Sequence, residues 1–154
     1  MSATTDHSIP RWELDFYDGV LPKRLIAWFI DVAITAVLAA PLILPVLAIG
    51  AFLIFPLLLI PLIWATTGFL YRWATLSSRS ATWGMRLMAI ELRDDQGQLL
   101  SGSTAFMHVL GSTLSFAFPL VQAGSMLAMA VTPKGQGLTD MVLGTVMLNT
   151  AARP

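Results

Sequence analysis

Arg24 and Asp31 are the residues of this sequence whose types and spacing point most directly to chemistry. They open a long apolar run, in which residues 22–32 read Pro-Lys-Arg-Leu-Ile-Ala-Trp-Phe-Ile-Asp-Val. On a helix, their spacing corresponds to about two turns, so both side chains share one face and lie roughly 10 Å apart along the axis. A carboxylate at that depth of a membrane costs roughly 2.5–3.5 kcal/mol unless it faces protein or water. Two explanations for a buried Asp31 follow. Its carboxylate either pairs with another group and fixes the packing of the helices, or it takes part in moving a proton or a cation.

The sequence lacks the common catalytic and cofactor motifs. It contains no cysteine, and its two histidines, His7 and His108, are too far apart in sequence for a zinc motif. The segment Gly135-Gln-Gly137 is too short for a phosphate-binding loop, and there is no nucleophile elbow. We therefore expect no enzymatic activity, no cofactor and no metal site. A catalytic carboxylate pair made by Asp31 and Asp140 is the alternative.

The composition indicates an integral membrane protein. Of the 154 residues, 56% are hydrophobic and only 12% are charged, and the mean hydropathy is +0.73. A soluble domain has about twice that share of charged residues. The formal net charge is zero, which argues against a nucleic-acid partner because such proteins carry basic patches. We expect the lipid bilayer to be the main environment of the chain.

The apolar run between Leu25 and Leu70 contains a single ionisable residue, Asp31. At about 1.5 Å per residue, a helix of that length would measure roughly 69 Å, enough to cross a hydrocarbon core of about 30 Å twice. We predict two transmembrane helices, at about 24–44 and 48–70. Pro45 is the expected corner between them because proline cannot donate the helical hydrogen bond.

Charged and aromatic residues predict the orientation. Lys and Arg flank the two spans on both sides, whereas the turn between the spans has none. By the positive-inside rule, both flanks and the N-terminus of this multi-pass protein are expected to be cytoplasmic. We expect Trp64, Tyr71 and Trp73, with Arg72, to form an interfacial belt at the end of the second span.

The chain divides into one membrane domain, at 22–149, and two tails. The tail at 1–21 mixes acidic and aromatic residues and has no segment typical of a cleavable signal. Residues 2–10 read as disordered, and the aromatic segment from Trp12 to Tyr17 either lies at the membrane interface or is a loosely anchored tail. The second tail, 150–154, is short.

A third apolar segment, at about 104–131, is interrupted by Pro119 and contains one titratable residue, His108. Its length allows one tilted crossing or a re-entrant pair of short helices hinged near Pro119. The segments 87–92 and 144–148 have the pattern of short strands. If they pair in a small cytoplasmic β-hairpin-like element, the third segment must enter and leave on the same face of the membrane. We favour this re-entrant arrangement within an otherwise all-α membrane fold.

Several motifs together resemble those of the RDD family of small bacterial membrane proteins. They are Arg24, Ala27 and Asp31, then Ser80-Ala-Thr-Trp-Gly-Met-Arg-Leu-Met-Ala-Ile, Thr132-Pro-Lys-Gly-Gln-Gly-Leu-Thr-Asp140, and Gly144-Thr-Val-Met. The resemblance covers residues 16–149. The family is named for one arginine and two aspartates, which correspond by motif to Arg24, Asp31 and Asp140. Arg86 matches the end of a common Gly-Lys-Arg stretch with Met85 in place of the lysine, and His108 stands where many members carry arginine.

The resemblance implies an inner-membrane protein of a family whose function is largely unassigned, with transport proposed and cation/proton exchange suggested for some members. Two hypotheses follow for this chain. In the first, Arg24, Asp31 and Asp140 are a polar lock that fixes the packing of an accessory or assembly subunit in a larger membrane complex. In the second, Asp31 is the intramembrane carboxylate of a cation/proton transport protein, which would have to be a homo-oligomer because so few segments cannot enclose a water path alone. Arg86 and His108 are further polar candidates in either case.

Overall fold

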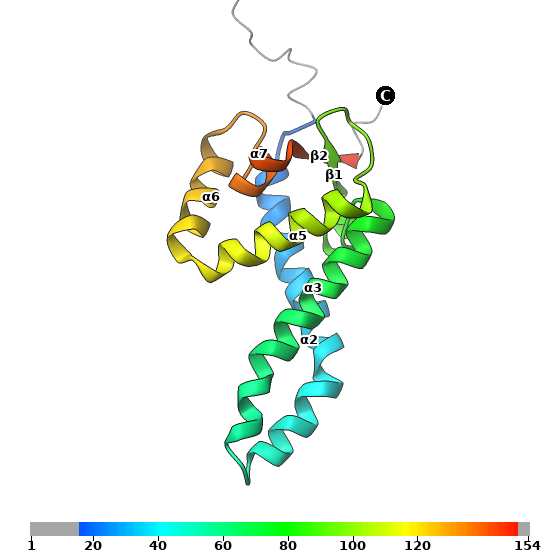
Figure 1. The fold of residues 1–154 in the computed structure, drawn as a ribbon. Coiled ribbons are helices and arrows are strands. Elements are labelled where there is room, and N and C mark those ends of the chain that lie inside the picture. Colours follow the sequence, from blue (N-terminus) through cyan, green and yellow to red (C-terminus); the bar gives the residue numbers. More distant parts are fainter. Residues whose placement is uncertain (1–15, 151–154) are drawn as a thin grey trace, which may run out of the picture.

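Two long helices form an antiparallel hairpin that dominates the computed structural model, which describes residues 16–150 (Figure 1). Helix α2 runs over Val20–Gly50 and helix α3 over Leu59–Arg79. A short 3₁₀ turn, η1 at Phe55–Leu58, precedes α3. Both helices are long and apolar enough to cross a membrane. The prediction of two spans is therefore confirmed, although α2 is longer than predicted at both ends and α3 begins and ends later than predicted.

The corner between the spans lies later than predicted. Pro41 and Pro45 are inside α2, which continues to Gly50. The prediction of a corner at Pro45 was wrong because membrane helices tolerate proline, whose freed carbonyls can be satisfied locally. The turn instead follows Gly50, where a Cβ atom would overlap the side chain of Leu57. Glycine thus allows the two ends of the turn to approach closely.

Small residues bring the two long helices together. The buried positions along the middle of α2 recur every four residues and are Ala27, Asp31, Thr35 and Ala39. This spacing places them on one face of the helix. On α3, a Cβ atom at Gly68 would lie 3.3 Å from the Thr35 side chain. Close helix packing in membranes is typical of such small residues.

A small antiparallel sheet lies at one end of the hairpin, which we call the sheet end. Strand β1, Ile90–Asp94, pairs with β2, Thr145–Asn149, with Leu92 opposite Met147. The prediction of two paired strands is confirmed, but β1 begins later than position 87. Leu87 instead ends a short helix, α4, which spans Trp83–Leu87. The Thr82 hydroxyl caps the N-terminus of this helix by accepting a hydrogen bond from the Met85 amide.

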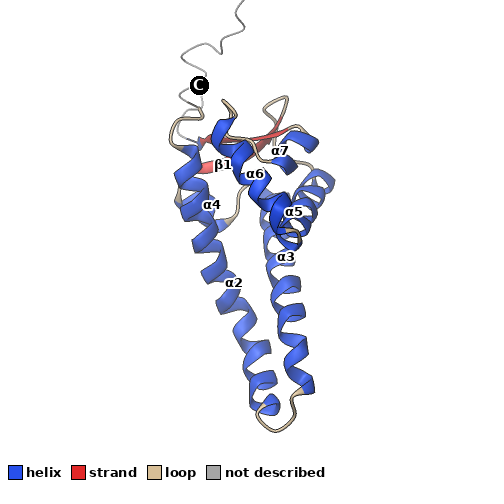
Figure 2. Cartoon of the chain, turned by 90° about the vertical axis from the view of Figure 1, so that its left-hand side faces the viewer, coloured by secondary structure: helices blue, strands red, loops and turns tan. Residues whose placement is uncertain are grey.

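The third apolar segment is a sharply bent pair of helices, and whether it crosses the membrane or is re-entrant stays a prediction. Helix α5, Gly102–Ala117, and helix α6, Pro119–Val131, are bent by 119° at Phe118. The bend follows from Pro119, because the residue before a proline avoids the helical conformation, and Phe118 is extended. Helix α7, Leu138–Leu143, then leads into β2. Figure 2 shows that α6, α7 and the strands gather at the sheet end of the long helices.

Buried apolar residues from distant parts of the chain form the core under the sheet. They include Leu76 of α3, Ile90 and Leu92 of β1, Val109 of α5 and Met147 of β2. The start of the described chain is attached to the same region. The Asn149 amide donates to the Phe16 carbonyl at 2.9 Å, and Lys23 Nζ donates to Asn149 Oδ1 at 2.6 Å. The predicted disorder of residues 2–10 and most of the predicted interfacial segment lie outside the described residues.

Candidate functional site

Arg24 and Asp140 form a salt bridge between α2 and α7. Arg24 Nη2 donates to Asp140 Oδ2 at 2.8 Å, and Arg24 Nη1 donates to the Gly135 carbonyl at 3.1 Å. The sequence positions are 116 residues apart. The bend between α5 and α6 makes this contact possible because it returns the chain to the sheet end. The return of the chain thus places Asp140 beside Arg24.

Asp140 is surrounded by donors and is only 1% exposed. Its Oδ1 atom lies 2.8 Å from His108 Nε2 and 3.2 Å from the Thr145 hydroxyl, and its Oδ2 atom also accepts from the Gly137 amide at 3.1 Å. Burial alone would raise the pKa of Asp140, but the His108 hydrogen bond and the Arg24 charge lower this pKa well below its usual range. Asp140 is therefore held as a carboxylate. We call Arg24, His108, Asp140, Gly137 and Thr145 the Asp140 cluster.

Asp31 has a separate set of donors and, among the described residues, makes no hydrogen bond or salt bridge with Arg24. Its Oδ1 atom accepts from the Tyr71 hydroxyl at 2.7 Å and from the Gly84 amide at 2.9 Å. Its Oδ2 atom accepts from the Thr82 hydroxyl at 2.6 Å. Asp31 is 3% exposed. We call Asp31, Tyr71, Thr82 and Gly84 the Asp31 cluster, which ties α2 to α3 and to the start of α4.

Gly84 is essential to the geometry of the Asp31 cluster. A Cβ atom at this position would overlap the Ala27 carbonyl oxygen and would lie 2.8 Å from Asp31 Oδ1. Since both obstacles belong to the packed face of α2, neither can move away freely. The absence of a side chain lets the N-terminus of α4 rest directly on α2 and lets its amide reach the carboxylate.

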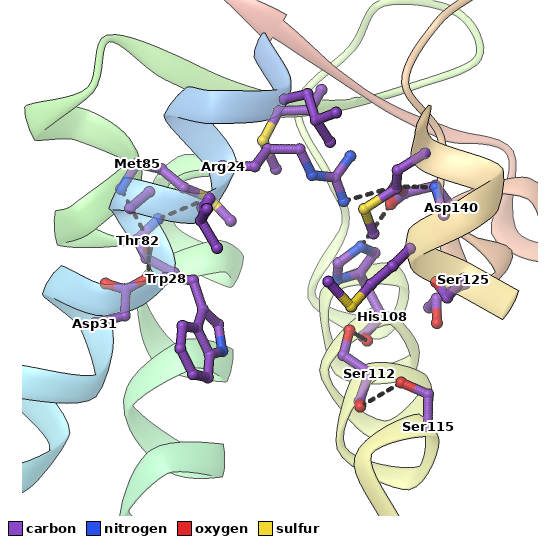
Figure 3. Close-up of a pocket in the computed structure, with 18 of the residues that line it drawn as sticks. Arg24, Trp28, Asp31, Thr82, Met85, His108, Ser112, Ser115, Ser125 and Asp140 are labelled. Atoms are coloured by element: carbon purple, nitrogen blue, oxygen red, sulfur yellow. Dashed lines mark hydrogen bonds and ion pairs between the residues drawn. The ribbon is translucent and has the colours of Figure 1, made fainter. Parts of the chain in front are cut away.

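A cavity of about 680 Å³ lies between the two clusters. Figure 3 shows Trp28 and Asp31 on one wall and His108, Ser112 and Ser115 on the other, with Arg24 reaching across toward Asp140. Most of the remaining wall is apolar. The two aspartates thus border the same space, although each is bound by different protein donors.

Some roles were missed or misassigned from the sequence. Tyr71 was predicted to anchor α3 at the interface, but it points inward because α3 continues to Arg79 and its hydroxyl bonds to Asp31. The role of Thr82 was missed, although the residue lies in one of the motifs quoted above. Arg86 belongs to neither cluster, and its guanidinium carbon lies 4.7 Å from the centre of the Trp83 ring. His108 is the hydrogen-bonded partner of Asp140.

Most of the chain matches the model of a known protein family. Residues 19–144 match the model of the RDD family. The chain belongs to the RDD family. RDD proteins are membrane proteins, in agreement with the two apolar helices of the hairpin. Searches of curated proteins and of solved structures found no match.

The three residues that correspond to the name of the family separate into two clusters in this RDD protein. Arg24 pairs with Asp140, and Asp31 is bound elsewhere, so the arginine is not shared between the aspartates. Within residues 16–150, no group of three or more His, Asp or Glu side chains is arranged to hold a metal ion. The chemistry of both clusters is therefore that of charged groups satisfied by hydrogen bonds.

We expect Thr82→Val to destabilise the protein by about 1–3 kcal/mol, because Asp31 loses a donor and α4 loses its cap. The measurement is unfolding by a denaturing detergent in mixed micelles. Thr75→Val is the matched control, since the Thr75 hydroxyl bonds only to carbonyls of its own helix, and its effect should stay within about 0.5 kcal/mol. Equal effects of the two substitutions would contradict the assigned role of Thr82.

Proposed function

We propose that this RDD protein is a non-enzymatic accessory or assembly subunit of a larger complex in a bacterial inner membrane, with its N-terminus in the cytoplasm. In this proposal the Asp140 and Asp31 clusters are two polar locks. They fix the re-entrant helices and the sheet against the hairpin, so that the hairpin presents a rigid surface to a partner. The distribution of Lys and Arg in the sequence supports the orientation.

The observation that carries this proposal is the complete pairing of both buried aspartates. Each carboxylate oxygen of Asp31 and of Asp140 accepts at least one hydrogen bond from the protein. A carboxylate that exchanges protons or cations needs access to water and a change of partners. A fully paired carboxylate joining separate segments is better suited to fixing how they pack.

The surface of the hairpin offers room for a partner. On α2, Ala33 and Ala36 are exposed, and they lie between Phe29 and Val37, which are 59% and 73% exposed. Small residues beside large apolar ones let a second helix approach closely in a bilayer. Helices α5 and α6 leave this face of α2 uncovered.

Extraction of the tagged protein from its native membrane with a mild detergent tests the proposal. We expect the protein to migrate on a native gel in a complex that contains a different protein in a fixed ratio. Ala36→Trp should release that partner because it blocks close approach, whereas Asp95→Asn, in an exposed turn, should retain it. A preparation that contains only copies of this chain in every detergent would contradict the proposal.

The cavity favours a second candidate function, cation/proton transport by a homo-oligomer. Asp31 lines this space together with Arg72 and the polar side chains of Ser112, Ser115 and Gln122. A carboxylate inside a membrane span, beside a cavity that contains polar side chains, is a common element of proton relays. In this candidate, Asp31 would exchange one of its hydrogen-bond donors for a proton or a cation.

Proton flux in proteoliposomes under a cation gradient distinguishes the two functions. If Asp31 carries the ion, Asp31→Asn abolishes flux, while Asp95→Asn leaves it unchanged. If the wild-type protein shows no flux under any gradient, the transport candidate is wrong. Folding of each variant is checked by its elution profile and by unfolding in detergent.

A further inference from the structure

The cavity lies between two walls that come from different helices. One wall comes from α2 and includes Leu25, Trp28 and Asp31, and the other comes from α5 and α6 and includes Phe116 and Met126. Figure 3 shows the space that separates Trp28 from Ser112 and Ser115 on the opposite wall. A volume of about 680 Å³ falls within the range of about 300–1,000 Å³ that is usual for small-molecule sites. The cavity is therefore large enough for an organic ligand.

Arg72 contributes a cation to this cavity from within a membrane span. It lies on α3, whose last residue is Arg79, so it is about two turns, roughly 10 Å, inside the end of the helix. Arg72 lines the cavity, and its guanidinium makes no hydrogen bond or salt bridge with any residue between Phe16 and Thr150. Arg24, by contrast, uses both of its terminal nitrogens on protein acceptors. Arg72 thus offers a guanidinium fork to a ligand.

The rim of the cavity is apolar. It is lined by Leu21 and Leu25 of α2, which are 43% and 53% exposed. Phe116 of α5 and Met126 of α6 also line it and are 47% and 56% exposed. Since these side chains belong to the apolar segments of a membrane protein, we expect the opening between α2 and the α5–α6 pair to face lipid. A ligand that enters here comes from the bilayer and has an apolar part.

We propose that this cavity binds a bilayer phospholipid, with its phosphate on Arg72 and an acyl chain along the apolar wall between α2 and α6. Arginine binds phosphate through two parallel hydrogen bonds. Basic pockets between transmembrane helices recognise lipid headgroups in the same way. Asp31 and its donors border the site, so a bound headgroup lies against the Asp31 cluster. This inference does not depend on whether the protein has a protein partner.

Native mass spectrometry of the purified protein, titrated with palmitoyl-oleoyl phosphatidylglycerol, tests the proposal. We expect one lipid to bind to the wild-type protein. Arg72→Gln should weaken this binding about tenfold or more, because a charge-assisted hydrogen bond is lost. Arg79→Gln is the matched control, since Arg79 is an exposed cation of the same helix that does not line the cavity, and it should bind lipid as the wild type does.

Further probes separate the two parts of the ligand. Palmitoyl-oleoyl glycerol, which lacks the phosphate, should bind about tenfold more weakly than the phospholipid, and inorganic phosphate alone should not displace the phospholipid. Met126→Trp alters an exposed position of the rim and should exclude the acyl chain without unfolding the protein, so it decides the matter even if Arg72→Gln fails to fold. Unchanged lipid binding in Met126→Trp, equal loss in Arg72→Gln and Arg79→Gln, or efficient displacement by inorganic phosphate would each overturn the proposal.

Discussion

Replacement of Gly84 by alanine should destabilise the protein by about 2–4 kcal/mol, because the new methyl group overpacks the contact between α4 and α2. The methyl carbon would overlap the Ala27 carbonyl oxygen and would lie 2.8 Å from Asp31 Oδ1. Relief of this overlap must move α4 away from α2. The Gly84 amide and the Thr82 hydroxyl would then lose their hydrogen bonds to the carboxylate, so one methyl group should disrupt the whole Asp31 cluster.

Gly102→Ala is the matched control for this experiment. Gly102 begins α5, and a Cβ atom there meets nothing within 4 Å. Alanine at Gly102 should leave stability unchanged within about 0.5 kcal/mol or raise it slightly, because alanine favours helix more than glycine does. Unfolding by a denaturing detergent in mixed micelles measures both variants. Similar unfolding curves for the two variants would show that the close approach at Gly84 does not hold the fold.

Asp140→Asn should have an effect of similar size. It removes the charge that Arg24 and His108 face, and loss of one partner of a buried ion pair costs about 3–5 kcal/mol. We expect about 2–4 kcal/mol here, because the Arg24 side chain is 13% exposed and partial solvation lowers the cost. The control is the double substitution Arg24→Met with Asp140→Asn, which removes both charges of the pair. Its stability should exceed that of Asp140→Asn alone, and a double variant that is less stable would contradict the assigned pairing.

The same carboxylate predicts the response of the protein to acid. Because the folded-state pKa of Asp140 is lowered, its contribution to stability is fully present above the unfolded pKa of about 3.9. This contribution is lost progressively as the pH falls below about 4 toward the folded pKa. The free energy of unfolding of the wild-type protein should therefore fall more steeply below about pH 4 than that of Asp140→Asn. Parallel pH profiles would show that Asp140 is not held as a carboxylate.

Local sequence patterns were enough to define most of the architecture. The length of the apolar run between Leu25 and Leu70 required two crossings, and Pro119 marked the bend of the third segment because its effect on the preceding residue is local. The patterns of the two short strands allowed them to pair, and pairing would return the chain to one face. In the structure that return places Asp140 beside Arg24, with Arg24 Nη2 2.8 Å from Asp140 Oδ2.

Other features depended on contacts that no local pattern contains. The corner after Gly50 depends on a close approach between Gly50 and Leu57. The prolines inside α2 led to the wrong position for this corner because a membrane helix tolerates proline. Tyr71 resembled an interfacial anchor because tyrosine is common at interfaces, whereas its inward direction depends on how α3 packs on α2.

The sequence by itself determined that this is a membrane protein of the RDD family, with a buried aspartate that needs partners. Only the tertiary structure decided which partners those are. The donors to Asp31 lie 40, 51 and 53 residues away along the chain, and the partner of Arg24 lies 116 residues away. A buried charge must be satisfied by some donor, but composition and periodicity do not specify which one. Helix packing made that selection, and it left Arg72 facing the cavity.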